Sequence, residues 1–144
     1  MKDVIAALAI ALAAPAMADS YIYTGAWSQH FSGKEYNETN RMLAVAVDGY
    51  MAGYFRNSYD EDAFMLARQF TANHGDIQFG VSLGAVYGYR HCLKGWSDSS
   101  RRVCPLAVPS VTYTGYPVQP SLMLVGEALA ISIRTDLSIF GGAK

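Results

Sequence analysis

Apolar residues alternate with small or polar residues along much of the chain after residue 18. The clearest stretch is residues 77–90, where large apolar side chains fill one parity and mostly small or polar ones fill the other. Successive side chains of a β-strand point to opposite faces, so this pattern predicts a strand with one apolar face. The stretch is also longer than the roughly 9–11 residues that a tilted strand needs to cross a membrane. We therefore expect a transmembrane β-barrel.

Turn signals divide the rest of the chain into further strands. Asp48-Gly49 favours a two-residue hairpin, because Asp-Gly readily adopts the positive φ angles of a type I′ turn. Residues 73–76 and 115–117 are also rich in turn-forming residues. The expected strands are residues 21–31, 41–47, 50–57, 62–71, 77–91, 103–114, 118–125 and 128–140. The predicted fold class is all-β, a single eight-stranded antiparallel up-and-down β-barrel of outer-membrane type.

The alternation leaves open which face of each strand lies inside the barrel. In the last predicted strand, Arg134 and Asp136 share one parity, and such side chains are costly against lipid but can pair in a polar interior. Strand length and the small residues on this parity also favour an outward apolar face. The residues expected to point outward are Ile77, Phe79, Leu83, Ile131 and Leu137. A soluble lipocalin-like barrel would have the opposite arrangement.

Tyrosine is abundant near the ends of the predicted strands. Transmembrane barrels carry girdles of aromatic side chains at both membrane interfaces, although tyrosine is also common in strands generally. We expect these girdles to include Tyr21, Tyr23, Tyr50, Tyr54, Tyr87, Tyr89, Tyr113 and Tyr116.

The first 18 residues have the pattern of a cleavable signal peptide. Lys2 lies near their start, residues 4–14 are apolar, and Ala16-Met17-Ala18 matches a small-x-small cleavage site. The apolar stretch is shorter than the roughly 20 residues of a membrane-spanning helix. We therefore expect a signal peptide of residues 1–18, followed by one β-barrel domain of residues 19–144 in the cell outer membrane.

Charge and cysteine content narrow the choice of partners and cofactors. The formal net charge is −1 and no basic stripe is present, so nucleic acid is not an expected partner. Cys92 and Cys104 bracket a polar loop, and exported proteins favour pairing, so we expect a disulfide between them. A zinc site built from these cysteines and His91 would lack a fourth ligand. Neither a metal nor another cofactor is therefore expected.

Side chains suited to nucleophilic chemistry collect at one end of the predicted strands. His30 lies near the end of the first strand, and Asn57-Ser58 lie where the third strand enters its turn. A histidine within reach of a serine is the minimum of a nucleophile–base pair, and a nearby asparagine can orient the imidazole or donate to an oxyanion. Serine and asparagine are also ordinary turn residues, so loop hydrogen bonding is the alternative.

Three segments resemble the outer-membrane lipid A palmitoyltransferase family (PagP). Residues 35–38, Glu-Tyr-Asn-Glu, are similar to the Tyr-Asn-Glu at the end of that family's first external loop. Residues 55–59, Phe-Arg-Asn-Ser-Tyr, are similar to its Phe-Lys-Asp-Ser-Trp, with Asn57 in place of the catalytic aspartate. Residues 105–117 are similar to its proline-rich sixth strand and the turn after it. The order and approximate spacing agree over most of the mature chain.

The resemblance implies a barrel that moves an acyl chain from a phospholipid to lipid A, with catalytic roles for Ser58, His30 and Asn57. The residues implied to contact the lipid substrate are Tyr36, Asn37, Glu38, Pro105 and Pro109. In the family, gaps in strand pairing near such prolines admit lipid sideways. Prolines also mark ordinary strand ends and bulges. The expected partners are membrane lipids, namely phospholipid and lipid A, and the protein is expected to be a monomer.

Two other functions stay open from the sequence, because a fold does not determine a function. A non-catalytic outer-membrane barrel would use its external loops to bind or shield a surface partner. A soluble exported barrel would carry an apolar ligand inside. The direction of the apolar side chains separates the soluble barrel from the other two, and the distance between His30 and Ser58 bears on the enzyme.

Overall fold

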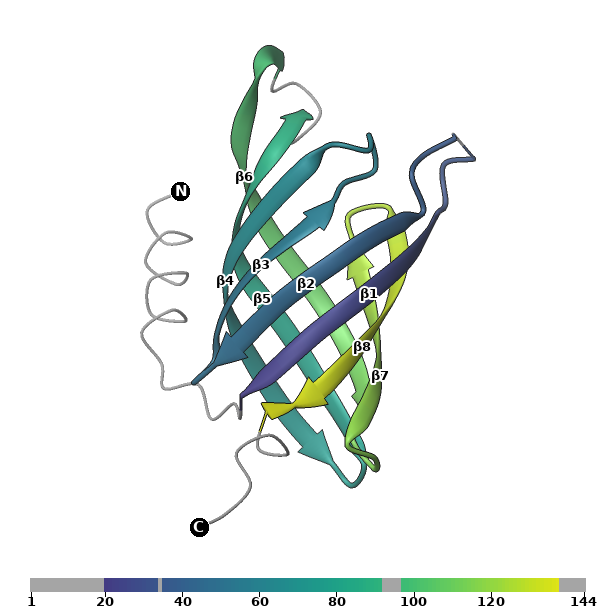
Figure 1. The fold of residues 1–144 in the computed structure, drawn as a ribbon, viewed down its shortest axis with the longest axis vertical. Helices are drawn as coiled ribbons and strands as arrows, with labels where there is room; N and C mark the ends of the chain where they lie inside the picture. The colour runs from purple at the N-terminus through teal and green to yellow at the C-terminus, as the bar shows by residue number, and fades with distance from the viewer. Residues whose placement is uncertain (1–19, 34, 92–96, 138–144) are drawn as a thin grey trace.

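The eight strands of the computed structural model close into an antiparallel barrel in sequence order (Figure 1). They are β1 (Tyr21–His30), β2 (Thr39–Val47), β3 (Tyr50–Arg56), β4 (Asp62–His74), β5 (Ile77–His91), β6 (Ser97–Tyr113), β7 (Val118–Val125) and β8 (Ala128–Asp136). The structure describes residues 20–33, 35–91 and 97–137. Pairing of β8 with β1 closes the sheet, which confirms the predicted eight-stranded antiparallel barrel. None of the described residues forms a helix long and apolar enough to cross a bilayer.

Three strand boundaries differ clearly from the prediction. β8 ends at Asp136 and not at residue 140, since Leu137 already lies outside the strand, and residues 138–140 lie outside the described residues. β4 continues to His74, because His74 pairs with Ile77 and only Gly75-Asp76 remain for the turn. β6 begins at Ser97, inside the segment expected to be a loop, because pairing with the end of β5 extends that far. The predicted signal peptide, residues 1–18, lies outside the described residues.

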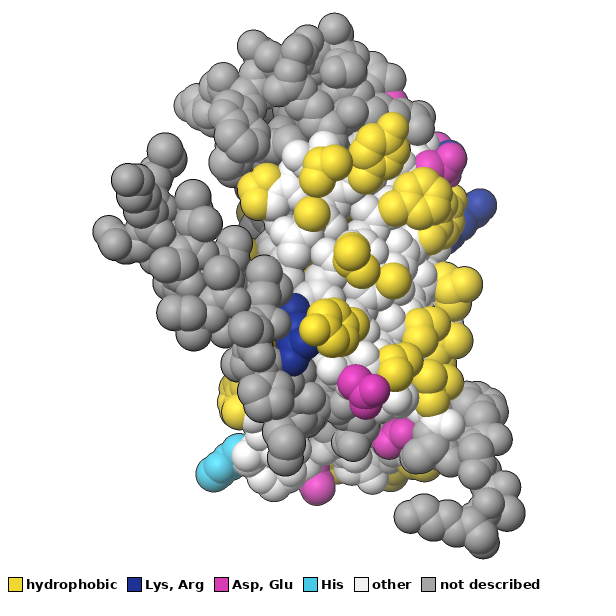
Figure 2. Space-filling view, turned by 90° about the vertical axis from the view of Figure 1, so that its left-hand side faces the viewer, with side chains coloured by type: hydrophobic (Ala, Val, Ile, Leu, Met, Phe, Trp, Pro, Cys, Tyr) yellow, Lys and Arg dark blue, Asp and Glu magenta, His cyan; other side chains and the backbone are white. Residues whose placement is uncertain are grey.

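Large apolar side chains face outward over much of the barrel. Phe79 and Ile131 are 53% and 50% exposed, and Ile77, Leu83 and Leu137 are partly exposed. Figure 2 shows hydrophobic side chains spread over one side of the barrel, with the visible acidic side chains nearer its ends. The outside of the described barrel is therefore its apolar face.

The inward parity consists mainly of small, polar and sulfur-containing side chains. Ala44, Ala46, Ala63, Ala67, Ser82, Ser121, Ser132, Met42 and Met51 are all buried there. An eight-stranded barrel is only wide enough for side chains to fill, so bulky residues cannot occupy every inward position. At Gly84, an added Cβ atom would lie 2.0 Å from the Leu66 carbonyl oxygen.

Only some of the tyrosines expected in the aromatic girdles face outward. Exposed tyrosines of the strands and turns include Tyr50, Tyr87, Tyr113 and Tyr116. Tyr21 and Tyr23 were wrongly expected among them, since both side chains are buried inside the barrel. Their polar neighbours explain this position, because the Tyr23 hydroxyl accepts a hydrogen bond from Gln69 Nε2 at 2.9 Å.

A buried arginine lies inside the barrel near the end where β1 begins and β8 ends. Arg134 is 1% exposed, and its Nε donates to Gln119 Oε1 at 2.8 Å. Its guanidinium also donates to Gln78 Oε1 and lies 3.8 Å from the centre of the Tyr21 ring. The inward direction of Arg134 agrees with the sequence pattern, but these neutral groups, rather than Asp136, are its partners.

Candidate active site

His30 and Ser58 lie in hydrogen-bond contact, with 2.8 Å between His30 Nε2 and Ser58 Oγ. His30 is the last residue of β1, and Ser58 lies in the turn between β3 and β4. They are 28 positions apart in the sequence, and the pairing of β2 with both β1 and β3 brings them to the same end of the sheet. The distance suits a general base next to a nucleophile.

A bulge in β1 directs His30 into the barrel. Tyr23 faces inside at an odd position, whereas Ala26 and His30 face inside at even positions. The change of parity occurs at Gly25 and Ala26, where the register with β8 shifts and the φ angles are 83° and 77°. A β-bulge adds one residue to a strand and re-aims the side chains that follow. Regular alternation from Tyr23 onward would have placed His30 on the outer face.

Asn57 is fully buried and stabilises the turn between β3 and β4. Its Nδ2 donates to the Gly88 carbonyl oxygen at 3.0 Å. Its Oδ1 accepts from the backbone N–H groups of Tyr59 at 2.9 Å and Glu61 at 3.1 Å. These backbone contacts occupy both ends of the amide, so Asn57 fixes the shape of the turn and makes no hydrogen bond to His30.

Tyr36 packs against the imidazole of His30. The two ring centroids are 4.5 Å apart, and Tyr36 meets the Tyr59 ring edge-on at 5.8 Å. His30 Nδ1 is buried and has no hydrogen-bond partner among the described residues. The Tyr36 ring is therefore a direct neighbour that can limit rotation of the imidazole.

Asn37 connects the first loop to the turn that carries Ser58. Its backbone N–H donates to the Ser58 carbonyl oxygen at 2.9 Å, and its Nδ2 donates to the Asn57 carbonyl oxygen at 3.1 Å. The neighbouring Glu38 accepts a backbone hydrogen bond from Ser28 at 2.8 Å, and its side chain is exposed. The Tyr-Asn-Glu segment thus borders the pair, and Asn37 holds the turn by donating hydrogen bonds to its backbone carbonyl oxygens.

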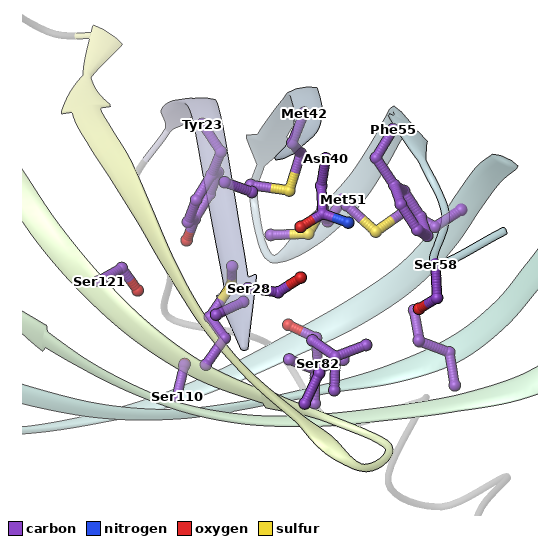
Figure 3. Close-up of a pocket in the computed structure, with 18 of the residues that line it drawn as sticks. Tyr23, Ser28, Asn40, Met42, Met51, Phe55, Ser58, Ser82, Ser110 and Ser121 are labelled. Carbon is purple, nitrogen blue, oxygen red and sulfur yellow. The ribbon is translucent and has the colours of Figure 1, made fainter. Parts of the chain in front are cut away.

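An apolar chamber enters the barrel beside Ser58 (Figure 3). Its apolar lining includes Met42, Met51, Phe55, Met65, Leu106, Val108 and Met123. The space inside it is narrow, with a cavity volume of about 90 Å³. Ligand pockets are mostly apolar with a few placed polar groups. The chamber therefore suits an apolar chain with its reactive end at Ser58.

A second hollow lies on the other side of the pair, next to β6. His30, Tyr36 and Ser58 line it together with Pro105 and residues 125–127. β6 pairs with β7 only from Ser110 to Thr112, although its pairing with β5 continues through both Pro105 and Pro109. Proline donates no ladder hydrogen bond, and the described β6–β7 ladder ends next to Pro109. The barrel wall is therefore weakly paired beside the candidate site.

The predicted disulfide falls partly beyond the described residues. Cys104 is buried and is not a free thiol. Cys92, its predicted partner, lies outside the described residues. The pairing therefore stays a prediction.

Two site residues were not anticipated from the sequence pattern. Tyr89 was placed on the outward parity, but it lines both hollows and meets Phe55 at a centroid distance of 6.4 Å. The register of β5 shifts at Gly88, which has a φ angle of 118°, and this turns Tyr89 inward. An isolated glycine inside a strand pattern is a recognised sign of a bulge. Asn40 of β2, the second such residue, gave no comparable signal.

No protein-family model matches this chain, and no curated protein matches it in sequence.

Proposed function

We propose that this protein is an acyltransferase of the bacterial outer membrane, which moves an acyl chain from a phospholipid to a lipid acceptor such as lipid A. The observation that carries this proposal is the contact between His30 and Ser58 at the mouth of an apolar chamber. A polar reacting pair beside an apolar chain-binding space is the arrangement that transfer of a fatty acyl group requires. The resemblance to the lipid A palmitoyltransferase family supports the same chemistry.

The proposed reaction uses the two side chains in sequence. His30 Nε2 takes the hydroxyl proton of Ser58 while Ser58 Oγ attacks the ester carbonyl carbon of the donor. The bond to the donor alkoxide breaks, and the imidazolium returns the proton to that leaving group. His30 then deprotonates the acceptor hydroxyl, which attacks the acyl-serine ester. The Ser58 alkoxide leaves and recovers its proton from the imidazolium.

The outer surface supports a membrane location for this reaction. Large side chains such as Leu66, Val103 and Phe79 are more than half exposed on the outside of the barrel. An outward apolar face with small and polar residues inside is the pattern of a barrel in lipid. A soluble carrier would place its large apolar side chains inside. The weakly paired edge of β6 would then let a lipid chain pass between the membrane and the chamber.

The direct test is the mass of lipid A from bacterial cells that express the full chain. We expect a mass increase of one acyl chain with the wild-type protein and none with Ser58→Ala. Ser32→Ala is the matched control, since Ser32 is an exposed serine of the first loop. It should retain the mass increase. Heat-dependent gel mobility would show that all three proteins are folded.

A folded wild-type protein in the outer membrane without any lipid mass change would refute the acyl-transfer proposal. It would favour a barrel whose loops bind or shield a surface partner. Recovery of the folded protein in the soluble exported fraction would refute the membrane location instead.

A further inference from the structure

Two buried oxygen atoms beside the reacting pair have no hydrogen-bond partner among the described residues. They are Ser28 Oγ and Asn40 Oδ1. Both side chains line the apolar chamber, and Figure 3 shows them around the same space as Ser58. Hydrogen-bonding groups that are buried in proteins nearly always have partners, so each exception calls for an explanation.

Both atoms lie close to the level of the reacting pair. Ser28 precedes His30 by two residues and faces the same side of β1. Asn40 Nδ2 donates at 3.0 Å to the carbonyl oxygen of Arg56, two residues before Ser58. The two oxygens therefore flank the part of the chamber that would hold the first carbons of an acyl chain.

The hydrogen-bonding chemistry of these two oxygens defines the kind of ligand group that would pair with them. Because Asn40 Nδ2 donates to the Arg56 carbonyl oxygen, the opposite end of the amide, Oδ1, points away from Arg56. Asn40 Oδ1 is therefore a hydrogen-bond acceptor that needs a donor. Ser28 Oγ can donate or accept. The nearby lining side chains Met42 and Phe55 provide no donor. A plain hydrocarbon chain would offer neither oxygen a hydrogen-bond partner.

We propose that the acyl chain bound in this chamber carries a hydroxyl group near its carboxyl end, and that Ser28 and Asn40 recognise it. The ligand O–H donates to Asn40 Oδ1, and its oxygen accepts from Ser28 Oγ. This inference rests on the proposed acyl-chain site and names the chain that the site selects. Sites built to hydrogen-bond a ligand hydroxyl reject the analogue that lacks it, because the buried groups of the site are then left unpaired.

A third unpartnered oxygen provides an internal control for position. Gln69 Oε1 is buried, has no hydrogen-bond partner within the described part of the chain, and also lines the chamber. The Gln69 backbone N–H donates to the Gly49 carbonyl oxygen at 2.7 Å, which places it near the turn between β2 and β3. That turn is at the end of the barrel opposite Ser58. Gln69 therefore cannot reach a hydroxyl group near the carboxyl end of a chain whose carboxyl group lies at Ser58.

The test compares binding of methyl 3-hydroxytetradecanoate and methyl tetradecanoate to the full chain folded in detergent. Ser58→Ala protein is used so that neither ester is consumed, and displacement of a fluorescent fatty acid gives the affinities. We expect a preference of about tenfold for the hydroxylated ester. Asn40→Leu and Ser28→Ala should each remove most of this preference. Gln69→Leu should keep it.

Equal affinity for the two esters would overturn the proposal, as would a preference that survives both Asn40→Leu and Ser28→Ala. Ser28→Ala removes a single oxygen, so the test does not depend on Asn40→Leu folding. The readout is binding and is independent of turnover. A hydroxyl preference without lipid acylation in cells would support this inference and refute the transferase proposal. Lipid acylation without the hydroxyl preference would support the transferase proposal and refute this inference.

Discussion

Asn57 occupies the position of an acid in the family that the sequence resembles, yet its side chain acts on the backbone. It donates to Gly88 and accepts from Tyr59 and Glu61. His30 is held by different contacts, namely Ser58 on one side and the Tyr36 ring on another. At the scale of the residue, the sequence singled out a serine and a histidine that the structure places in contact, but it did not show how each is supported.

Asn57→Asp is expected to destabilise the protein and not to improve activity. A carboxylate there would lose the donor to the Gly88 carbonyl oxygen and face that oxygen with a negative charge. The expected loss is about 2–3 kcal/mol in the free energy of unfolding. Urea unfolding in phospholipid vesicles measures it, with acyl transfer assayed on the folded fraction. Unchanged stability with faster turnover would show that an acid at this position serves His30.

Tyr36→Leu is expected to lower kcat of acyl transfer about tenfold while leaving KM for the donor lipid nearly unchanged. The aromatic ring lies against the imidazole, and leucine lacks the planar face that limits its rotation. Tyr36→Phe keeps the ring and should retain most of the activity. Steady-state kinetics in mixed micelles distinguishes the two variants. Equal losses in both would assign the effect to the hydroxyl instead of the ring.

At the scale of the element, alternation predicted where strands lie, and two bulges decided which side chains enter the site. Strand pattern and turn signals are local, so the sequence located all eight strands to within a few residues at most ends. The parity of a strand after a bulge depends on a backbone conformation at one position. Gly25 and Gly88 were visible as glycines, but neither was interpreted as a bulge, and regular alternation was applied across Gly88. Tyr89 was consequently placed on the wrong face.

Gly25→Ala is expected to reduce both stability and acyl transfer. The φ angle of 83° is costly for alanine, and an added Cβ atom would lie 3.1 Å from the Trp27 ring. The expected destabilisation is about 1–2 kcal/mol, with a larger fractional loss of activity because the bulge positions His30. Gly75→Ala is the matched control, since it has a φ angle of 58° but open space around it and lies in a distant turn.

The comparison uses urea unfolding and the lipid assay on the same two samples. Gly75→Ala should lose stability and keep the activity of its folded fraction. Comparable activity in both folded variants would show that the bulge at Gly25 is not needed to position His30.

At the scale of the whole molecule, the barrel has an apolar outer face and an inner face of small, polar and sulfur-containing side chains. That separation followed from alternation, and the charged Arg134 and Asp136 indicated the inner parity in advance. The contents of the interior did not follow in the same way. Contacts such as His30 with Ser58, or Arg134 with Gln78, join strands that are distant in the sequence. They depend on the register around a closed sheet, which no local pattern specifies.

Ile131→Arg is expected to destabilise the barrel in lipid by about 2–4 kcal/mol, because the side chain would face hydrocarbon near the middle of β8. Ile131 is 50% exposed on the outer face. Tyr116→Arg, at a position 65% exposed in the turn before β7, is the control and should change stability by about 0–1 kcal/mol. Unfolding in phospholipid vesicles provides both values. Near-zero effects for both would favour a barrel that is surrounded by water.

The enclosure of Arg134 also determines how such a barrel would behave electrically. An ion passing along the axis would have to displace the guanidinium from two glutamine oxygens and an aromatic ring. A cation would in addition meet a fixed positive charge inside a narrow, weakly polarisable space, where repulsion is strong. In a bilayer, such a barrel would keep a ligand space open at one end without conducting ions along its axis. Many copies could be present in one bilayer without dissipating a gradient across it.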